Sequence, residues 1–154
     1  MSHKVAIVIG SGSDRPVMQK AGEMLEEFGI DHHTQVLSAH KTPDEAIEFA
    51  ASAAGQGFEV IIAGAGKAAH LAGVMAAKSL LPVIGVPISA TLDGMDALLA
   101  TVQMPTGIPV ATVAIDGANN AALLAVAILA IGDEELTGKL IQYRKDLAAK
   151  TLAG

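Results

Sequence analysis

The stretch "LSAHKTPDE", residues 37–45, places a hydroxyl, an imidazole and an ammonium close together at Ser38, His40 and Lys41. An imidazole can both donate and accept a proton near neutral pH, which suits general acid–base catalysis. An ammonium can neutralise a phosphate. Taken singly, a loop histidine or a lysine is more often structural or simply solvated. Together, the three residues predict proton transfer beside a bound anion.

A second group of polar residues comes earlier, in "GSGSD" at residues 10–14. Two glycines and two hydroxyls precede a predicted helix here, and backbone N–H groups at a helix N-terminus favour an anion. Asp14 can bind a ribose hydroxyl, or Ser13 or Asp14 can simply cap the helix. The segment predicts a phosphate cradle made of Ser11, Gly12, Ser13 and Asp14.

The third group is "GAGKAAHL", residues 64–71, which contributes Gly66, Lys67, His70 and Leu71. The segment fits a dinucleotide-binding G-x-G-x-x-A pattern, but Pro87 stands where that pattern needs an acidic residue. The earlier glycine segment has Arg15 in place of its third glycine. We therefore expect no dinucleotide, and we expect His70 to line the same pocket as His40.

These segments must be positioned by alternating strands and helices. Apolar runs predict buried strands near residues 4–10, 34–37, 60–63, 83–86 and 110–115. Helical periodicity falls between them, and "TPDE" predicts a helix start with Thr42 as cap, Pro43 in the first turn and Glu45 completing a capping box. Such alternation predicts an α/β doubly wound, three-layer domain with a five-stranded parallel sheet. Ligands of such sheets bind beyond the carboxyl ends of the strands.

A further helix is predicted near residues 133–152, after a core of about residues 4–131 within one domain, 1–154. Its apolar stripe consists of Leu136, Leu140, Tyr143 and Leu147. No strand remains for this helix to cover, so we expect the stripe to dock on a neighbouring subunit rather than on its own sheet.

Composition limits the class of protein. The chain has 51% hydrophobic residues, 17% charged residues, no cysteine and a net charge of −6. We expect no nucleic-acid partner, because phosphate backbones are bound by clustered positive charge. We expect no membrane helix, no signal peptide and a cytoplasmic location. No metal site is expected, since His32 and His33 are adjacent on a strand and point to opposite faces.

Taken together, "GSGSD", "SAHKTP", "IIAGAGKAAHLAGV", "LPVIGVPI", "DALLATVQMPTGIPVATVAI" and "NAALLA" resemble the PurE family of purine biosynthesis. The motifs occur in family order over about residues 4–131. The resemblance implies a flavodoxin-like fold, a homo-octamer with shared active sites, and a class I 5-(carboxyamino)imidazole ribonucleotide mutase that needs no cofactor.

The resemblance also implies roles for the residues that match the family's motifs. His40 would be the general acid and base. Ser38 and Lys41, with Ser11, Ser13 and Asp14, would hold the phosphate and ribose of a nucleotide monophosphate. The segment 64–71, with His70, would enclose the aminoimidazole and the carboxyl group.

Three residues depart from the class I pattern: Lys41 replaces arginine, Lys67 replaces a small residue that is often glycine, and Ala72 replaces proline. Lysine at position 41 resembles the class II enzymes, which carboxylate aminoimidazole ribonucleotide directly with carbon dioxide. The class I form of "AGAGKAAHL" favours the mutase. A direct carboxylase and a non-catalytic nucleotide-binding relative stay open as alternatives. A flavin carrier is disfavoured, because it would need aromatic side chains to stack on the flavin ring, and the chain has no Trp and one Tyr.

Overall fold

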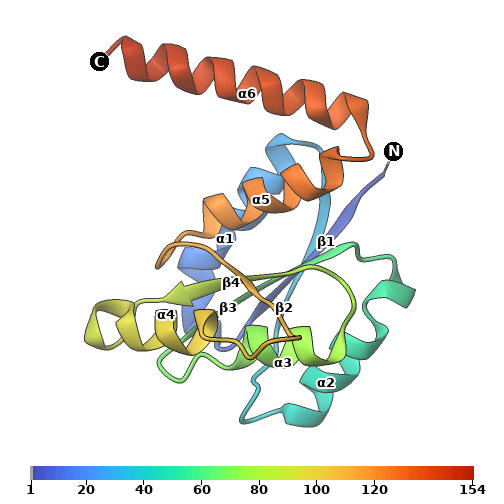
Figure 1. Cartoon of the computed structure of the whole chain (residues 1–154), viewed down its shortest axis with the longest axis vertical. Helices are drawn as coiled ribbons and strands as arrows, with labels where there is room; N and C mark the ends of the chain where they lie inside the picture. The colour runs from blue at the N-terminus through green and yellow to red at the C-terminus, as the bar shows by residue number, and fades with distance from the viewer. Residues whose placement is uncertain (1) are drawn as a thin grey trace.

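A single sheet of five parallel strands lies at the centre of the fold, in the order β2-β1-β3-β4-β5 (Figure 1). The structure is a computed structural model, and it describes residues 2–154. The strands are β1 Lys4–Ile9, β2 Asp31–Val36, β3 Val60–Gly66, β4 Val83–Ile88 and β5 Ala111–Thr112. The helices are α1 Arg15–Glu27, α2 Pro43–Ser52, α3 Leu71–Lys78, α4 Met95–Val102, α5 Ala118–Ala130 and α6 Glu134–Leu152, with 3-10 turns η1 Gly12–Asp14, η2 Ala54–Gln56 and η3 Leu92–Gly94.

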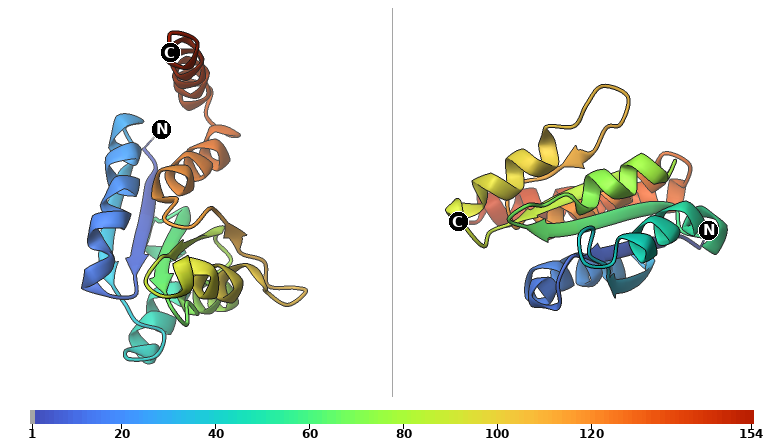
Figure 2. Two further views of the ribbon diagram at one scale, coloured as in Figure 1. Left: turned by 90° about the vertical axis from the view of Figure 1, so that its left-hand side faces the viewer. Right: turned by 90° about the horizontal axis from the view of Figure 1, so that it is seen from below.

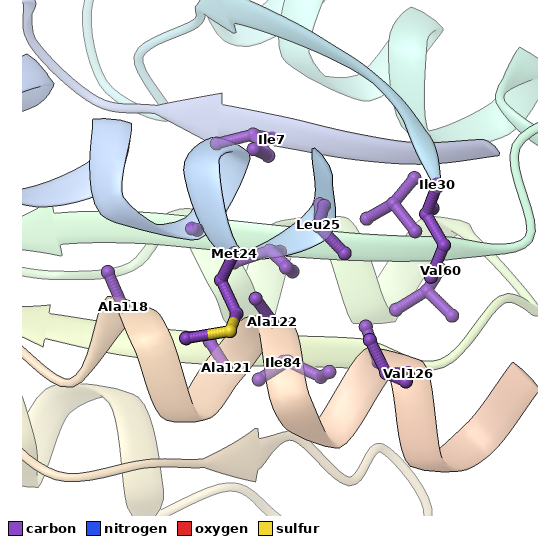
Figure 3. Packing of buried hydrophobic residues seen from close by; sticks show 14 of the residues in the cluster. Ile7, Met24, Leu25, Ile30, Val60, Ile84, Ala118, Ala121, Ala122 and Val126 are labelled. Carbon is purple, nitrogen blue, oxygen red and sulfur yellow. The ribbon is translucent and has the colours of Figure 1, made fainter. Parts of the chain in front are cut away.

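Helices cover both faces of the sheet, which explains why its inner strands are apolar on both sides. On one face, Ile7 and Ile62 pack with Met24 and Leu25 of α1 and with the alanines of α5. Figure 3 shows Met24 beside the small side chains of α5, which let the two helices approach closely. On the other face, Val8 and Ile61 pack under α2 and α3. The predicted doubly wound α/β fold is confirmed.

The strands differ in length from the prediction. β3 continues to Gly66 because Gly64, Ala65 and Gly66 pair with the last three residues of β4. A Cβ atom at Gly64 would come within 2.4 Å of the sulfur of Met18, so glycine lets α1 pack against the end of the strand. β5 is only two residues long, and the chain before it runs out from the body of the domain (Figure 2).

α6 extends beyond α5 and away from the sheet in Figures 1 and 2. Its start is fixed by Asp133, whose side chain accepts a hydrogen bond from the N–H of Leu136 at 3.0 Å. Leu136 is buried in the chain's own core, and Tyr143 packs on Phe28 with ring centroids 5.6 Å apart. Leu147 is half exposed. The predicted stripe is therefore divided: its first part packs on this chain, and its end is left uncovered. Within residues 2–154, no helix has the length and apolar character to cross a membrane.

Candidate active site

A cavity of about 400 Å³ lies where β1, β2 and β3 end. In this strand order, the chain leaves β1 and β3 toward opposite faces, which opens a crevice between them. The cavity is lined by Gly10, Ser11, Ser13, Asp14, Ser38, Ala39, His40, Lys41, Ala65, Gly66, Lys67, Ala68, His70, Leu71 and Ala90. Segments from after four of the strands, up to eighty residues apart in sequence, thus meet at one place. Of the residues predicted for the site, only Gly12 is outside this lining.

The segment after β1 presents two hydroxyls and a carboxyl group. The hydroxyls of Ser11 and Ser13 lie 2.9 Å apart, and that of Ser11 also accepts the N–H of Ser13 at 3.3 Å. Asp14 occupies the N-cap position of α1 but makes no side-chain capping bond. The capping alternative considered for Asp14 is therefore wrong, and its carboxyl group remains available to line the cavity.

The carboxyl group of Asp14 has an altered acidity. Burial raises its pKa above the ordinary value, the backbone bond with Ser11 opposes this, and the carboxylate of Asp116 adds to the rise. Asp116 was not singled out from the sequence, because it lies more than one hundred residues away. It adopts a φ of 59° and accepts the N–H of Ser89 at 2.9 Å, which ties the end of β4 to the start of α5.

A hydrogen bond between its two ends closes the segment after β2 into a loop. The prediction that Thr42 caps α2 with its side chain is wrong. Thr42 stands at the N-cap of α2 but makes no side-chain cap. Its backbone has φ −132° and ψ 58°, and its hydroxyl turns back to accept the N–H of Ser38 at 2.9 Å. The first turn of α2 instead has acidic residues at Asp44 and Glu45, which the helix dipole favours.

Ser38 completes this closure from the other side. Its hydroxyl accepts the N–H of Lys41 at 3.0 Å and keeps its own proton, which it can donate to an anion. His40 and Lys41 are the exposed middle of the segment. The structure brings Ser38, His40 and Lys41 together at the cavity, through bonds that the sequence pattern did not indicate.

His40 and His70 form a pair across the cavity. Nε2 of His40 lies 2.8 Å from Nδ1 of His70, and the rings meet edge to face with centroids 4.8 Å apart. One ring nitrogen must donate and the other accept, so each ring restricts the tautomer of the other. Both side chains are exposed. The pair can therefore exchange a proton with a ligand in the cavity.

Lys67 marks the tip of the segment after β3. Its φ is 55°, a left-handed conformation that glycine adopts more easily than lysine. A hydrogen bond from the hydroxyl of Thr91 lowers the pKa of Asp96, and the ammonium of Lys67 acts in the same direction. Lys67 lines the cavity, and its positive charge also acts on the carboxylate of Asp96 in the first turn of α4.

The cavity also has lining that the sequence pattern could not indicate. Ala39, Ala65 and Ala68 lie in segments predicted for the site but were not singled out because they carry no functional group, and Ala90, after β4, is identified only by the fold. His32 lies outside the cavity, where Nε2 contacts Glu26 at 2.9 Å. Within residues 2–154, no cluster of three or more His, Cys, Asp or Glu side chains is arranged to hold a metal ion.

The fold and the cavity define a class of protein: a doubly wound α/β domain with a small polar site at its switch point. The family model described as AIR carboxylase matches residues 4–150. The chain belongs to this family, which confirms the resemblance to PurE.

Individual relatives agree with the family. The chain is 58% identical over 145 residues to the N5-carboxyaminoimidazole ribonucleotide mutase of Pyrococcus abyssi, covering 94% of this chain and 83% of that one. It is 57% identical over 145 residues to the enzyme of the same name from Escherichia coli, covering 92% and 86%. The crystal structure of Treponema denticola PurE superposes with a TM-score of 0.87 at 28% identity, covering 97% and 94%.

Proposed function

We propose that the protein is an isomerase of de novo purine biosynthesis that converts 5-(carboxyamino)imidazole ribonucleotide into 4-carboxy-5-aminoimidazole ribonucleotide. The observation that carries the proposal is the identity of 57% and 58%, over more than nine-tenths of the chain, to enzymes named as this mutase. Three of the segments that resemble the family, "GSGSD", "SAHKTP" and "IIAGAGKAAHLAGV", line one cavity, which supports a common site.

The reaction moves one carboxyl group and one proton. The bond between the exocyclic nitrogen and the carboxyl carbon breaks, and carbon dioxide is held in the cavity while the nitrogen gains a proton. Carbon dioxide then bonds to the ring carbon, which loses its proton. No electron is gained or lost overall, and one group that can both donate and accept a proton completes the cycle. His40 has this role in the proposal, and its contact with His70 supports it.

The remaining polar residues would bind the nucleotide. The hydroxyls of Ser11, Ser13 and Ser38 and the ammonium of Lys41 would surround the phosphate, and Asp14 would bind the ribose. Gly66 and Leu71 would border the ring, as the family motif implies. Gly12 would act through the backbone of η1, because it does not line the cavity.

The test is an absorbance assay for conversion of 5-(carboxyamino)imidazole ribonucleotide, with His40→Asn as its control. Conversion by the wild type and its loss in the variant support the proposal. If the wild type converts none of this substrate, the mutase function is wrong. Aminoimidazole ribonucleotide with bicarbonate is assayed alongside, because faster turnover of that pair would identify a direct carboxylase.

The assembly is a proposal as well, namely a homo-octamer with shared active sites. A groove of about 820 Å³ between α5 and α6 supports it, since Leu123, Leu124 and Leu140 line the groove and Leu147 stands half exposed beside them. Sedimentation velocity would measure the size, and a monomer at working concentration would contradict it. The cytoplasmic location also stays a proposal, which cell fractionation can test.

A further inference from the structure

The strongest feature that the proposed mechanism does not use is the hydroxyl of Thr42. It is a helix-cap residue by position, yet it makes no cap. Its oxygen accepts the N–H of Ser38 at 2.9 Å and lies 3.2 Å from the carbonyl oxygen of the same residue, to which it donates. One side chain therefore binds both backbone groups of a residue four positions earlier in the sequence.

Two further bonds join the same ends. The N–H of Thr42 also donates to the carbonyl oxygen of Ser38 at 3.0 Å, and the N–H of Lys41 donates to the hydroxyl of Ser38 at 3.0 Å. The segment 38–42 is thus a closed loop held by four hydrogen bonds. His40 and Lys41 lie inside it, so the position of the imidazole and that of the ammonium depend on the same closure.

The chemistry of threonine suits this closure. A β-branched side chain has few χ1 rotamers, so the hydroxyl keeps one direction at small entropic cost. Pro43 follows and disfavours a helical conformation at Thr42, whose backbone is indeed non-helical, with φ −132° and ψ 58°. Ser38 and Thr42 are both partly buried, so water does not freely replace the bonds between them.

We propose that Thr42 is a positioning residue: its hydroxyl holds the loop 38–42 so that His40 faces His70 while Lys41 and the Ser38 hydroxyl face the phosphate. This inference rests on the proposed mutase function for its kinetic test. Small misplacements of reacting groups cost up to about 100-fold in rate. Loss of the hydroxyl should therefore affect proton transfer and phosphate binding together, although Thr42 touches neither.

The experiment compares Thr42→Val, Thr42→Ala and Thr42→Ser with Thr101→Val. Thr101 is the matched control, because its hydroxyl also donates to the carbonyl oxygen of the residue four positions earlier, that of Ala97 at 2.7 Å, and it lines neither the cavity nor the groove. We expect Thr42→Val and Thr42→Ala to lower kcat by about 10- to 100-fold and to raise KM for the carboxyamino substrate. Thr42→Ser should recover both constants to within about threefold, because it keeps the hydroxyl. Thr101→Val should leave both unchanged.

A purely structural role would give another pattern. Thr42→Val and Thr101→Val would then lower the melting temperature alike, with wild-type kinetic constants at 25 °C for both, and that result would overturn the inference. A second readout does not need turnover: the ¹⁵N imidazole signals of His40 and His70 should shift in Thr42→Val and return in Thr42→Ser. Unchanged signals in Thr42→Val would also overturn it, whereas an inactive wild type would overturn only the mutase function.

Discussion

Histidine is used in two opposite ways at the two edges of the sheet. At the carboxyl edge, His40 and His70 are exposed and contact each other. At the amino edge, His3 is 8% exposed, with Nδ1 2.8 Å from the carboxylate of Glu59 and Nε2 3.0 Å from that of Asp133. One environment leaves the imidazole open to a ligand, and the other surrounds it with negative charge.

The surroundings of His3 join three distant parts of the chain. Glu59 precedes β3, and Asp133 caps α6, so the imidazole fastens the start of α6 beside the start of β1. Burial by itself lowers the pKa of His3, but the hydrogen bonds and charges of the two carboxylates outweigh it, and the pKa is raised above 6.5. We infer that the amino edge stabilises the fold and the carboxyl edge performs the chemistry.

The largest expected effect comes from His40→Asn. A general acid–base residue contributes about 100- to 10,000-fold to the rate, so kcat should fall by that order. The free energy of unfolding should change by less than about 0.5 kcal/mol, because the side chain is exposed. The absorbance assay and denaturant unfolding measure the two quantities. A variant that keeps its activity would contradict the assignment of the carboxyl edge to chemistry.

His3→Gln should show the opposite behaviour. The imidazole of His3 links the carboxylates of Glu59 and Asp133. Losing these contacts should lower the free energy of unfolding by about 1–3 kcal/mol, and kcat should be retained. His33→Gln is the control, since His33 is exposed on β2 and its loss should cost less than about 0.5 kcal/mol. If the two variants are equally stable, the bridge at His3 contributes nothing.

The pH dependence of stability sharpens the same comparison. Because the folded pKa of His3 is raised, its contribution is fully present below the unfolded value of 6.5 and is lost as pH rises through the folded value. The difference in unfolding free energy between wild type and His3→Gln should therefore be largest below pH 6.5 and shrink as the pH rises above that value. The backbone bond from Leu136 and the contact with His3 lower the pKa of Asp133, so its contribution is lost only below 3.8. A difference that stays constant as the pH rises above 6.5 would contradict the charged bridge.

The two edges also differ in how much the sequence predicts. His40 is predicted as a site residue from its immediate neighbours Ser38 and Lys41, although its contact with His70, thirty residues away, is not visible in that pattern. His3 was missed, since its partners are 56 and 130 residues away and no local pattern links them. Apolar periodicity predicts the order and type of the elements. It overestimates the length of β5, because an apolar run at the edge of a sheet does not show how many of its residues pair with the neighbouring strand.

Local patterns also mislead when a side chain has two possible partners. The sequence "TPDE" predicted a capping box, but the Thr42 hydroxyl binds Ser38. Hydroxyl side chains compete for nearby backbone groups, and which bond forms depends on the path of the preceding strand. That path is a property of the whole sheet.

The smallest expected effect concerns Lys67, at the carboxyl edge. We propose that its ammonium, which lines the cavity, steadies the carboxylate of the substrate, and an exposed ion pair contributes up to about 1 kcal/mol. Lys67→Gly should therefore lower turnover of the carboxyamino substrate about 2- to 5-fold relative to aminoimidazole ribonucleotide with bicarbonate. Stability should change little, because glycine suits a φ of 55° but is more flexible when unfolded.

Asp96→Asn separates this role of Lys67 from a structural one, since the ammonium also acts on the carboxylate of Asp96. If Lys67 serves only to join the two loops through Asp96, both variants should change turnover in the same way. If it binds the substrate carboxylate, Asp96→Asn should leave the ratio of the two activities unchanged or raise it, because a competing negative charge is gone. Lys78→Ala, on the exposed end of α3, is the control for loss of a lysine. If the ratio of the two activities is unchanged in Lys67→Gly, Lys67 does not bind the substrate carboxylate. The titratable groups proposed to act in the site would then be His40, His70, Lys41 and Asp14.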